Sequence, residues 1–93
     1  MYASVRQYRS SDASEVGRRA SEGFVPIVKK IPGVSAWYLI DGGDGTLVTV
    51  TLSDDQAGAD ASVKEAAQWV GENAADLVEG SPNVTNGEVV AQS

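Results

Sequence analysis

The 93-residue chain contains no cysteine and no histidine. The absence of cysteine excludes disulfide bonds, thiolate catalysis and zinc–thiolate sites. The absence of histidine removes the commonest general base at neutral pH, the usual haem ligand and the commonest ligand of transition metals. It also excludes every nucleophile that depends on a neighbouring histidine. Acid–base chemistry would therefore fall to a carboxylate, a tyrosine or the solvent.

Positive charge is also scarce, with 7 basic residues against 13 acidic ones and a net charge of −6. This balance repels phosphate backbones and anionic lipids, so binding to nucleic acid or to a membrane surface is not expected. No apolar run reaches the length of a signal peptide or a membrane span. We therefore expect a cytoplasmic protein without nucleic-acid or membrane partners.

What the chain does contain fits one small globular domain over residues 1–93, with 42% hydrophobic residues. A chain of this size buries only about 60–65% of the surface that it exposes when unfolded. Association with a second copy would be a natural source of added stability.

The strand signals are spread along the chain. Residues 2–8 alternate between β-forming and polar side chains, and β-rich runs follow at residues 34–40 and 46–52. The glycines and aspartates of residues 41–45 join these two runs and predict a hairpin. A last strand is expected at about residues 84–91.

A first helix is predicted over residues 12–30, where apolar side chains recur at helical intervals. Asp12 and Glu15 have the spacing of a capping box. Pro26 lies inside this pattern and predicts a kink or break near Phe24, because proline lacks a backbone donor.

A second helix is expected to begin at residues 53–55 and to end at residues 80–82, Gly-Ser-Pro. Its predicted apolar stripe consists of Val63, Ala67, Val70, Ala74 and Leu77.

The resulting order is βαββαβ, which predicts a ferredoxin-like α+β fold: a four-stranded antiparallel sheet with two helices on one face. Alternation along residues 34–40 directs Trp37 and Leu39 to one face of the sheet, and Tyr38 and Ile40 to the other. Both faces are thus apolar, and the helices can cover only one. We expect a second copy of the chain to cover the other, which predicts a homodimer through the sheet face.

Four segments of the chain carry a family resemblance: Glu-Gly-Phe-Val-Pro-Ile at 22–27, Ile-Pro-Gly-Val-Ser-Ala-Trp-Tyr at 31–38, Asp-Gly-Gly-Asp-Gly-Thr at 41–46, and Asp-Gln-Ala-Gly-Ala at 55–59. With them, nearly the whole chain resembles small bacterial proteins of the antibiotic biosynthesis monooxygenase-like superfamily, above all uncharacterised members. The resemblance implies a dimeric α+β barrel, in which two sheets pack face to face. It also implies a pocket between sheet and helices in each subunit.

Characterised members of that superfamily carry out several reactions, and the fold alone does not choose among them. Haem degradation there relies on a histidine of the second helix, which this chain lacks. Cofactor-free oxygenases of aromatic polyketides and quinols line their pocket with tryptophan, asparagine, tyrosine and arginine. The nearest residue types here are Trp69, Asn73 and Arg6, and the resemblance implies no cofactor.

Trp69 and Asn73 lie four residues apart, on one face of the predicted second helix. They could form a pocket wall that stacks on a flat ligand and binds its oxygen. Alternatively, Trp69 covers the edge of the core and Asn73 is solvated, which is the commoner situation for such residues.

Trp37 and Tyr38 should face the two sides of the sheet, one toward the helices and the other toward the dimer seam. Core packing explains both equally simply. Phe24 with Pro26 could form a kinked lid over a pocket or a plain structural kink.

Arg6 shares its strand face with Tyr8. In a barrel interior it could hold an enolate or phenolate oxygen, as cofactor-free oxygen chemistry requires. An ordinary ion pair, for example with Glu88, is the simpler interpretation. The loop at residues 41–44 lacks the ligand spacing of a calcium site, so no metal is expected.

Two hypotheses remain open. In the first, the chain is a dimeric barrel that binds a small, flat, apolar molecule and acts as a cofactor-independent monooxygenase. In the second, it is a non-catalytic ligand-binding or structural dimer whose interior is filled by its own side chains. The ligand candidates are Arg6, Phe24, Trp37, Tyr38, Trp69 and Asn73.

Overall fold

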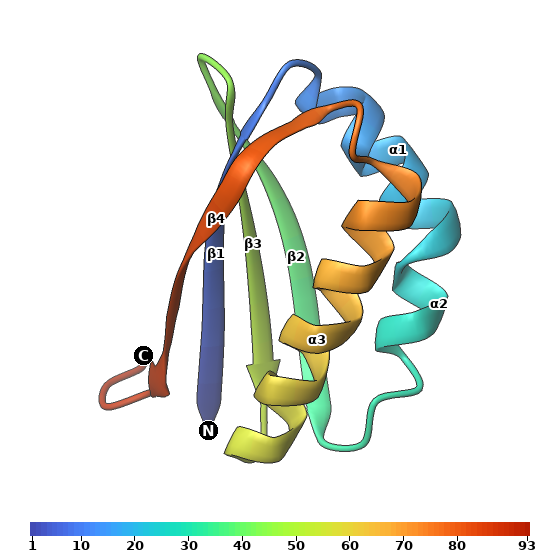
Figure 1. Cartoon of the computed structure of the whole chain (residues 1–93). Helices are drawn as coiled ribbons and strands as arrows, with labels where there is room; N and C mark the ends of the chain where they lie inside the picture. Colours follow the sequence, from blue (N-terminus) through green and yellow to red (C-terminus); the bar gives the residue numbers. More distant parts are fainter.

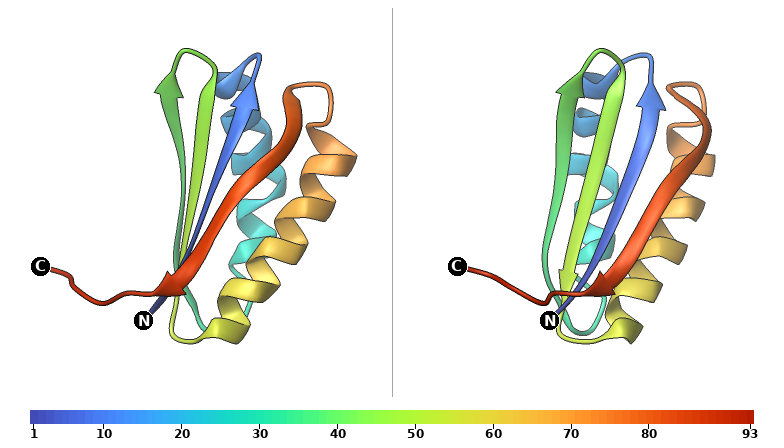
Figure 2. Two further views of the ribbon diagram at one scale, coloured as in Figure 1. Left: turned by 60° about the vertical axis from the view of Figure 1, so that its left-hand side comes forward. Right: turned by 90° about the vertical axis from the view of Figure 1, so that its left-hand side faces the viewer.

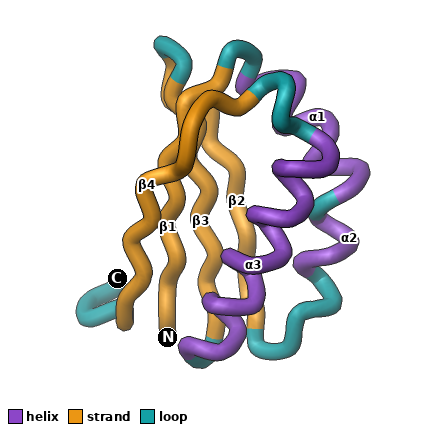
Figure 3. The backbone as a smooth tube through the Cα atoms, viewed as in Figure 1, coloured by secondary structure: helices purple, strands orange, loops and turns teal.

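The computed structural model describes all 93 residues. Its elements follow the order β1 (Tyr2–Ser10), α1 (Ala13–Gly23), α2 (Val25–Val28), β2 (Val34–Gly43), β3 (Thr46–Ser53), α3 (Gln56–Asn73) and β4 (Val78–Glu88). The four strands form one antiparallel sheet in the order β2-β3-β1-β4. All helices lie on one side of this sheet (Figures 1 and 3). The α+β, ferredoxin-like prediction is confirmed.

The predicted first helix is broken at Phe24 into α1 and α2. Pro26 lies in the first turn of α2, where its missing N–H needs no intrahelical acceptor. At the start of α1 the Asp12 side chain accepts a hydrogen bond from the Glu15 amide at 3.1 Å. The predicted break and the cap by Asp12 are confirmed. The second half of the capping box is not formed, because the Asp12 amide donates to Ser10 Oγ and the Glu15 carboxylate accepts from Arg18 and Arg19.

The buried face of α3 differs from the predicted stripe. It consists of small residues followed by one tryptophan: Gly58, Ala59, Ser62, Ala66 and Trp69. Val63 and Val70 are half-buried and Ala67 is exposed. The prediction was right for Ala74, which is fully buried, and wrong for the positions before it. It followed hydrophobicity, whereas close approach of the helix to the sheet selects small side chains. At Gly58 an added Cβ would lie 3.0 Å from Ser53 Cβ.

The C-terminal boundary of α3 also differs from the prediction. The helix ends at Asn73, and residues 80–82 lie inside β4 rather than at the helix end. In the β1–β4 register Gln7 pairs with Asn83 and Arg9 with Glu79, so residues 80–82 bulge opposite Tyr8. A bulge tolerates Pro82, because no ladder hydrogen bond is required of it there.

The sheet presents its other face without a helix over it, as the right-hand view of Figure 2 shows. Tyr38 and Ile40 on this face are 55% and 46% exposed. They pair with Val50 and Val48 on the neighbouring strand β3, which extends the apolar surface over both strands.

None of the helices has both the length and the apolar composition that a membrane-spanning helix needs.

Candidate functional site

Three aromatic side chains from different elements meet between the sheet and the helices. Phe24 lies between α1 and α2, Trp37 on β2 and Trp69 on α3. The Phe24 ring centroid lies 5.1 Å from that of Trp37 at an interplanar angle of 62°, and 5.7 Å from that of Trp69 at 51°. Such tilted and edge-on pairs suit the aromatic quadrupole. Phe24 is 1% exposed, so it forms an interior wall and does not lie over an opening as a lid would.

Arg6 on β1 is buried beside these rings, with 1% of its surface exposed. Its Nε donates a hydrogen bond to Thr49 Oγ1 at 3.1 Å. Its Nη1 donates to the main-chain oxygens of Ser62 and Val63, at 3.3 and 3.4 Å. Its Nη2 is buried and has no hydrogen-bond partner within the protein. The Arg6 side chain thus links the sheet to the backbone of α3, while its Nη2 donates no hydrogen bond within the protein.

Arg6 forms no ion pair, and the pair with Glu88 suggested by the sequence does not exist. In the β1–β4 register Glu88 lies opposite Tyr2, whereas Val84 lies opposite Arg6. Burial lowers the pKa of Arg6, because desolvation disfavours its charged form. A buried charge without a carboxylate partner is expensive, so an occupant of opposite charge would be stabilised here.

Tyr8 is the neighbour of Arg6 on the same face of β1 and is 5% exposed. Burial raises the pKa of its phenol, and the positive charge of Arg6 partly opposes this rise. Tyr8 was not among the residues proposed from the sequence. Its two-residue spacing from Arg6 on an alternating strand was the signal that could have identified it.

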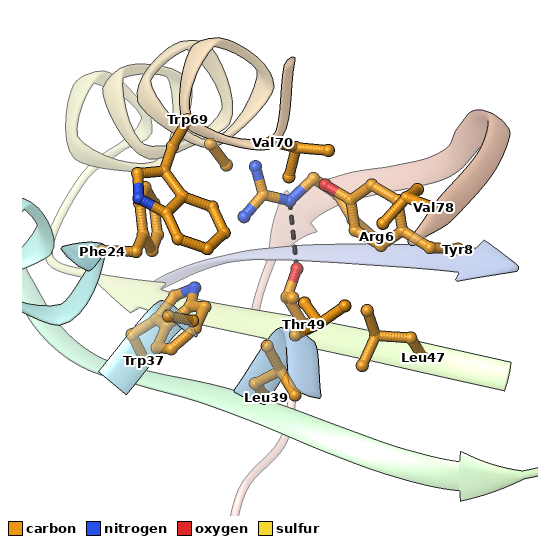
Figure 4. Close-up of a pocket in the computed structure, with 13 residues that line it drawn as sticks. Arg6, Tyr8, Phe24, Trp37, Leu39, Leu47, Thr49, Trp69, Val70 and Val78 are labelled. Carbon is orange, nitrogen blue, oxygen red and sulfur yellow. Dashed lines mark hydrogen bonds between the residues drawn. The ribbon is translucent and has the colours of Figure 1, made fainter. Parts of the chain in front are cut away.

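The aromatic side chains and Arg6 enclose a small cavity (Figure 4). Its free volume is about 20 Å³, which is enough for about one water molecule. The lining residues are Arg6, Tyr8, Val16, Ala20, Phe24, Trp37, Leu39, Leu47, Thr49, Ala66, Trp69, Val70 and Val78. The Trp37 indole nitrogen is a second buried donor without an acceptor. The cavity is therefore nearly filled by side chains, yet two N–H donors in its lining have no partner.

A larger groove of about 310 Å³ runs between α3 and β4. It shares four lining residues with the cavity: Arg6, Tyr8, Val70 and Val78. The groove is open because α3 leaves part of the inner face of β4 uncovered, and Val84 there is 45% exposed. Its volume reaches the lower end of the range for small-molecule sites. Because Arg6 lines both spaces, it lies at the boundary between the cavity and the groove.

The structure brings together four of the six residues proposed from the sequence, namely Arg6, Phe24, Trp37 and Trp69. Asn73 is exposed, and its amide donates a hydrogen bond to the Trp69 carbonyl at 3.1 Å, so it closes the end of α3. Tyr38 lies on the helix-free face of the sheet. No group of three or more acidic side chains lies close enough together to hold a metal ion.

No protein-family model and no curated protein sequence matches this chain. Solved structures do match it. A protein of unknown function from Nitrosomonas europaea, NE2512, superposes with a TM-score of 0.80 at 22% identity, covering 99% of this chain and 91% of that one.

Two characterised structures share the same fold. A monooxygenase from the gene ActVA-Orf6 of Streptomyces coelicolor, in complex with nanaomycin D, has a TM-score of 0.72 at 13% identity; the match covers 98% of this chain and 92% of that one. A mutant form of SnoaB, a cofactor-independent oxygenase from Streptomyces nogalater, has a TM-score of 0.73 at 10% identity, with 98% and 94% covered. The chain therefore has the fold of antibiotic biosynthesis monooxygenase-like proteins.

Proposed function

We propose that this chain is a cofactor-independent monooxygenase of a small, flat aromatic substrate of the quinol or anthrone type. The substrate lies in the groove between α3 and β4, with its ionised oxygen toward the Arg6 and Tyr8 side of the groove. The observation that carries the proposal is the buried Arg6 guanidinium, whose charge has no carboxylate partner. The oxygenases of the same fold support the choice of reaction class.

The role of Arg6 is electrostatic. In a site with few polar groups, a positive charge acts on an anion over several ångströms far more strongly than in water. The bound phenol or enol is therefore more acidic than in solution. Its anion is electron-rich enough to reduce oxygen directly, so the protein itself needs no redox group.

The lining of the groove limits the class of substrate. It contains no aspartate, glutamate or histidine, and Tyr8 is its only side chain besides Arg6 that titrates. A phenol whose pKa is raised is a poor base at neutral pH. The substrate must accordingly lose its proton to water, which favours quinols and anthrones over simple alcohols or alkanes.

The proposed active form is a homodimer in which two chains pack their helix-free sheet faces together. The exposed Tyr38 and Ile40 on that face support this arrangement. The groove lies on the helix side of each sheet, so each subunit keeps its own site.

The nearly filled cavity favours a second candidate, a non-catalytic ligand-binding or structural dimer. An oxygen electrode distinguishes the two. Anthrones and quinols are added to the protein after removal of metals and without any cofactor. Protein-dependent oxygen uptake with conversion of an anthrone to its quinone supports the monooxygenase, because this product contains an oxygen atom from O2. A quinol can form its quinone by electron loss alone, so its oxidation does not count as support. A panel without oxygen uptake contradicts the monooxygenase and leaves the binding protein.

A further inference from the structure

Two buried nitrogen donors, Arg6 Nη2 and Trp37 Nε1, have no partner within the protein, and they come from neighbouring positions on the inner face of the sheet. Arg6 pairs with Thr49, and Thr49 pairs with Leu39 on β2. Trp37 lies two residues from Leu39 on the same face of β2. Figure 4 shows the Arg6 guanidinium and the Trp37 indole nitrogen turned toward the space between β2 and α3. Both donors belong to side chains that line the same cavity.

No hydrogen bond within the protein reaches either donor. Among the side chains that line the cavity, only Tyr8 and Thr49 carry an oxygen, and Thr49 Oγ1 already accepts a hydrogen bond from Arg6 Nε. A buried N–H that finds no acceptor destabilises the folded chain, and more so when the donor is charged. Two such donors beside one cavity are hard to explain as packing alone.

The size of the cavity restricts its occupant. A free volume of about 20 Å³ excludes an aromatic ring but admits one or two atoms of the size of oxygen. The uncompensated charge of Arg6 favours an anion over water. The hydrophobic walls formed by Phe24, Leu39 and Trp69 favour a small apolar gas before it is reduced.

We propose that Arg6 Nη2 and Trp37 Nε1 form a binding site for dioxygen as it becomes superoxide. This assignment rests on the proposed function, since the substrate anion in the groove supplies the electron. Arg6 borders both spaces, so one guanidinium stabilises the substrate anion on one side and superoxide on the other.

The electron balance of the step is complete. The substrate anion gives one electron to O2, which yields a substrate radical and superoxide. The two radicals combine, and the new C–O bond produces a peroxide anion. Water protonates the peroxide anion. The carbon that carries the peroxide then gives up its hydrogen as a proton while the O–O bond breaks and hydroxide leaves, which forms the carbonyl of the quinone. The proton and the hydroxide combine, so that one oxygen atom stays in the product and the other leaves as water.

The site can be tested without substrate or oxygen, using bromide as a small monoatomic anion. Sodium bromide replaces sodium glutamate at constant ionic strength, and the indole N–H resonance of Trp37 is followed by NMR. A saturable shift with one site per chain is expected. Arg6→Met should abolish the saturation, whereas Arg9→Met, which removes an exposed arginine of the same strand, should leave it unchanged.

A linear, unsaturable shift would overturn the site, as would the same saturation in Arg6→Met. If bromide binds and quinol oxidation is observed, bromide must compete with oxygen and not with the quinol. Competition with the quinol alone would overturn the assignment to superoxide. Binding of bromide without any oxygen uptake would contradict the proposed function while leaving the anion site in place, and would remove superoxide as its occupant.

Discussion

At the scale of single residues, the interior combines tight aromatic packing with an uncompensated charge. Phe24 contacts both tryptophans and is almost fully buried. Its position follows from the helix break, which turns the side chain at the end of α1 toward the sheet. The aromatic wall therefore depends on one residue whose role is packing.

Truncation of Phe24 should accordingly be severe. Phe24→Ala is expected to lower the free energy of unfolding by about 3–5 kcal/mol, because it leaves a cavity between two tryptophans. Val90→Ala, at a side chain that is 93% exposed, should change it by less than about 0.5 kcal/mol. Urea unfolding followed by fluorescence measures both. A loss below about 1 kcal/mol for Phe24→Ala would contradict this packing role.

The sequence predicted which residues line the site better than it predicted which groups those residues contact. Arg6 and Trp69 could be proposed because they match residue types that line the pockets of the resembled oxygenases, and Trp37 because strand alternation directs it to one face of the sheet. The absence of a partner for Arg6 could not be foreseen, since it depends on the β1–β4 register. That register is shifted by a bulge, and no local pattern specifies which residues a bulged strand places opposite each other.

At the scale of elements, the order of strands and helices could be predicted from periodicity and turn residues. The contact face of α3 could not. Ala59, Ser62 and Ala66 carry little hydrophobic signal, although their small size lets the helix lie close to the sheet. The end of α3 was also misplaced, because Gly80 and Pro82 are as compatible with a strand bulge as with a helix stop.

Two glycines of α3 test this close approach as a matched pair. Gly58→Ala should lower the free energy of unfolding, because its Cβ would lie 3.0 Å from Ser53 Cβ and 3.2 Å from the Pro32 carbonyl oxygen. A Cβ at Gly71 would meet no atom within 4 Å. Gly71→Ala should therefore raise the free energy of unfolding by about 0.5–1 kcal/mol, because alanine has the higher helix propensity. Thermal unfolding followed by circular dichroism gives both signs, and stabilisation by Gly58→Ala would contradict the packing described.

At the scale of the whole molecule, the sheet is covered on one face only. A small domain with an apolar sheet face in water gains from covering it, which is the physical basis of the proposed homodimer. The groove and the cavity lie on the opposite, helix-covered side, so the proposed dimer seam and the proposed ligand site use different surfaces.

A charge at the centre of the helix-free face should separate the subunits. Val50 pairs with Val5 on β1 and Tyr38 on β2, so Val50→Lys would place an ammonium group in the middle of the seam. Light scattering should give about twice the chain mass of 9.7 kDa for the unaltered protein and the mass of one chain for Val50→Lys. Gln68→Lys, on the exposed side of α3, should remain dimeric, and a monomeric unaltered protein would contradict the seam.

The central claim is that the buried charge of Arg6 serves the ligand and not the fold. The most direct measurement compares Arg6→Met with the unaltered protein in two assays, urea unfolding and oxygen uptake with anthrones and quinols. Replacing a buried ion pair by apolar side chains is often neutral or stabilising, and Arg6 has no charged partner that its removal would leave buried and unpaired. We expect an unfolding free energy that is unchanged or raised by about 1–2 kcal/mol, together with loss of oxygen uptake. A variant that is destabilised by more than about 2 kcal/mol but keeps its oxygen uptake per folded molecule would contradict the account.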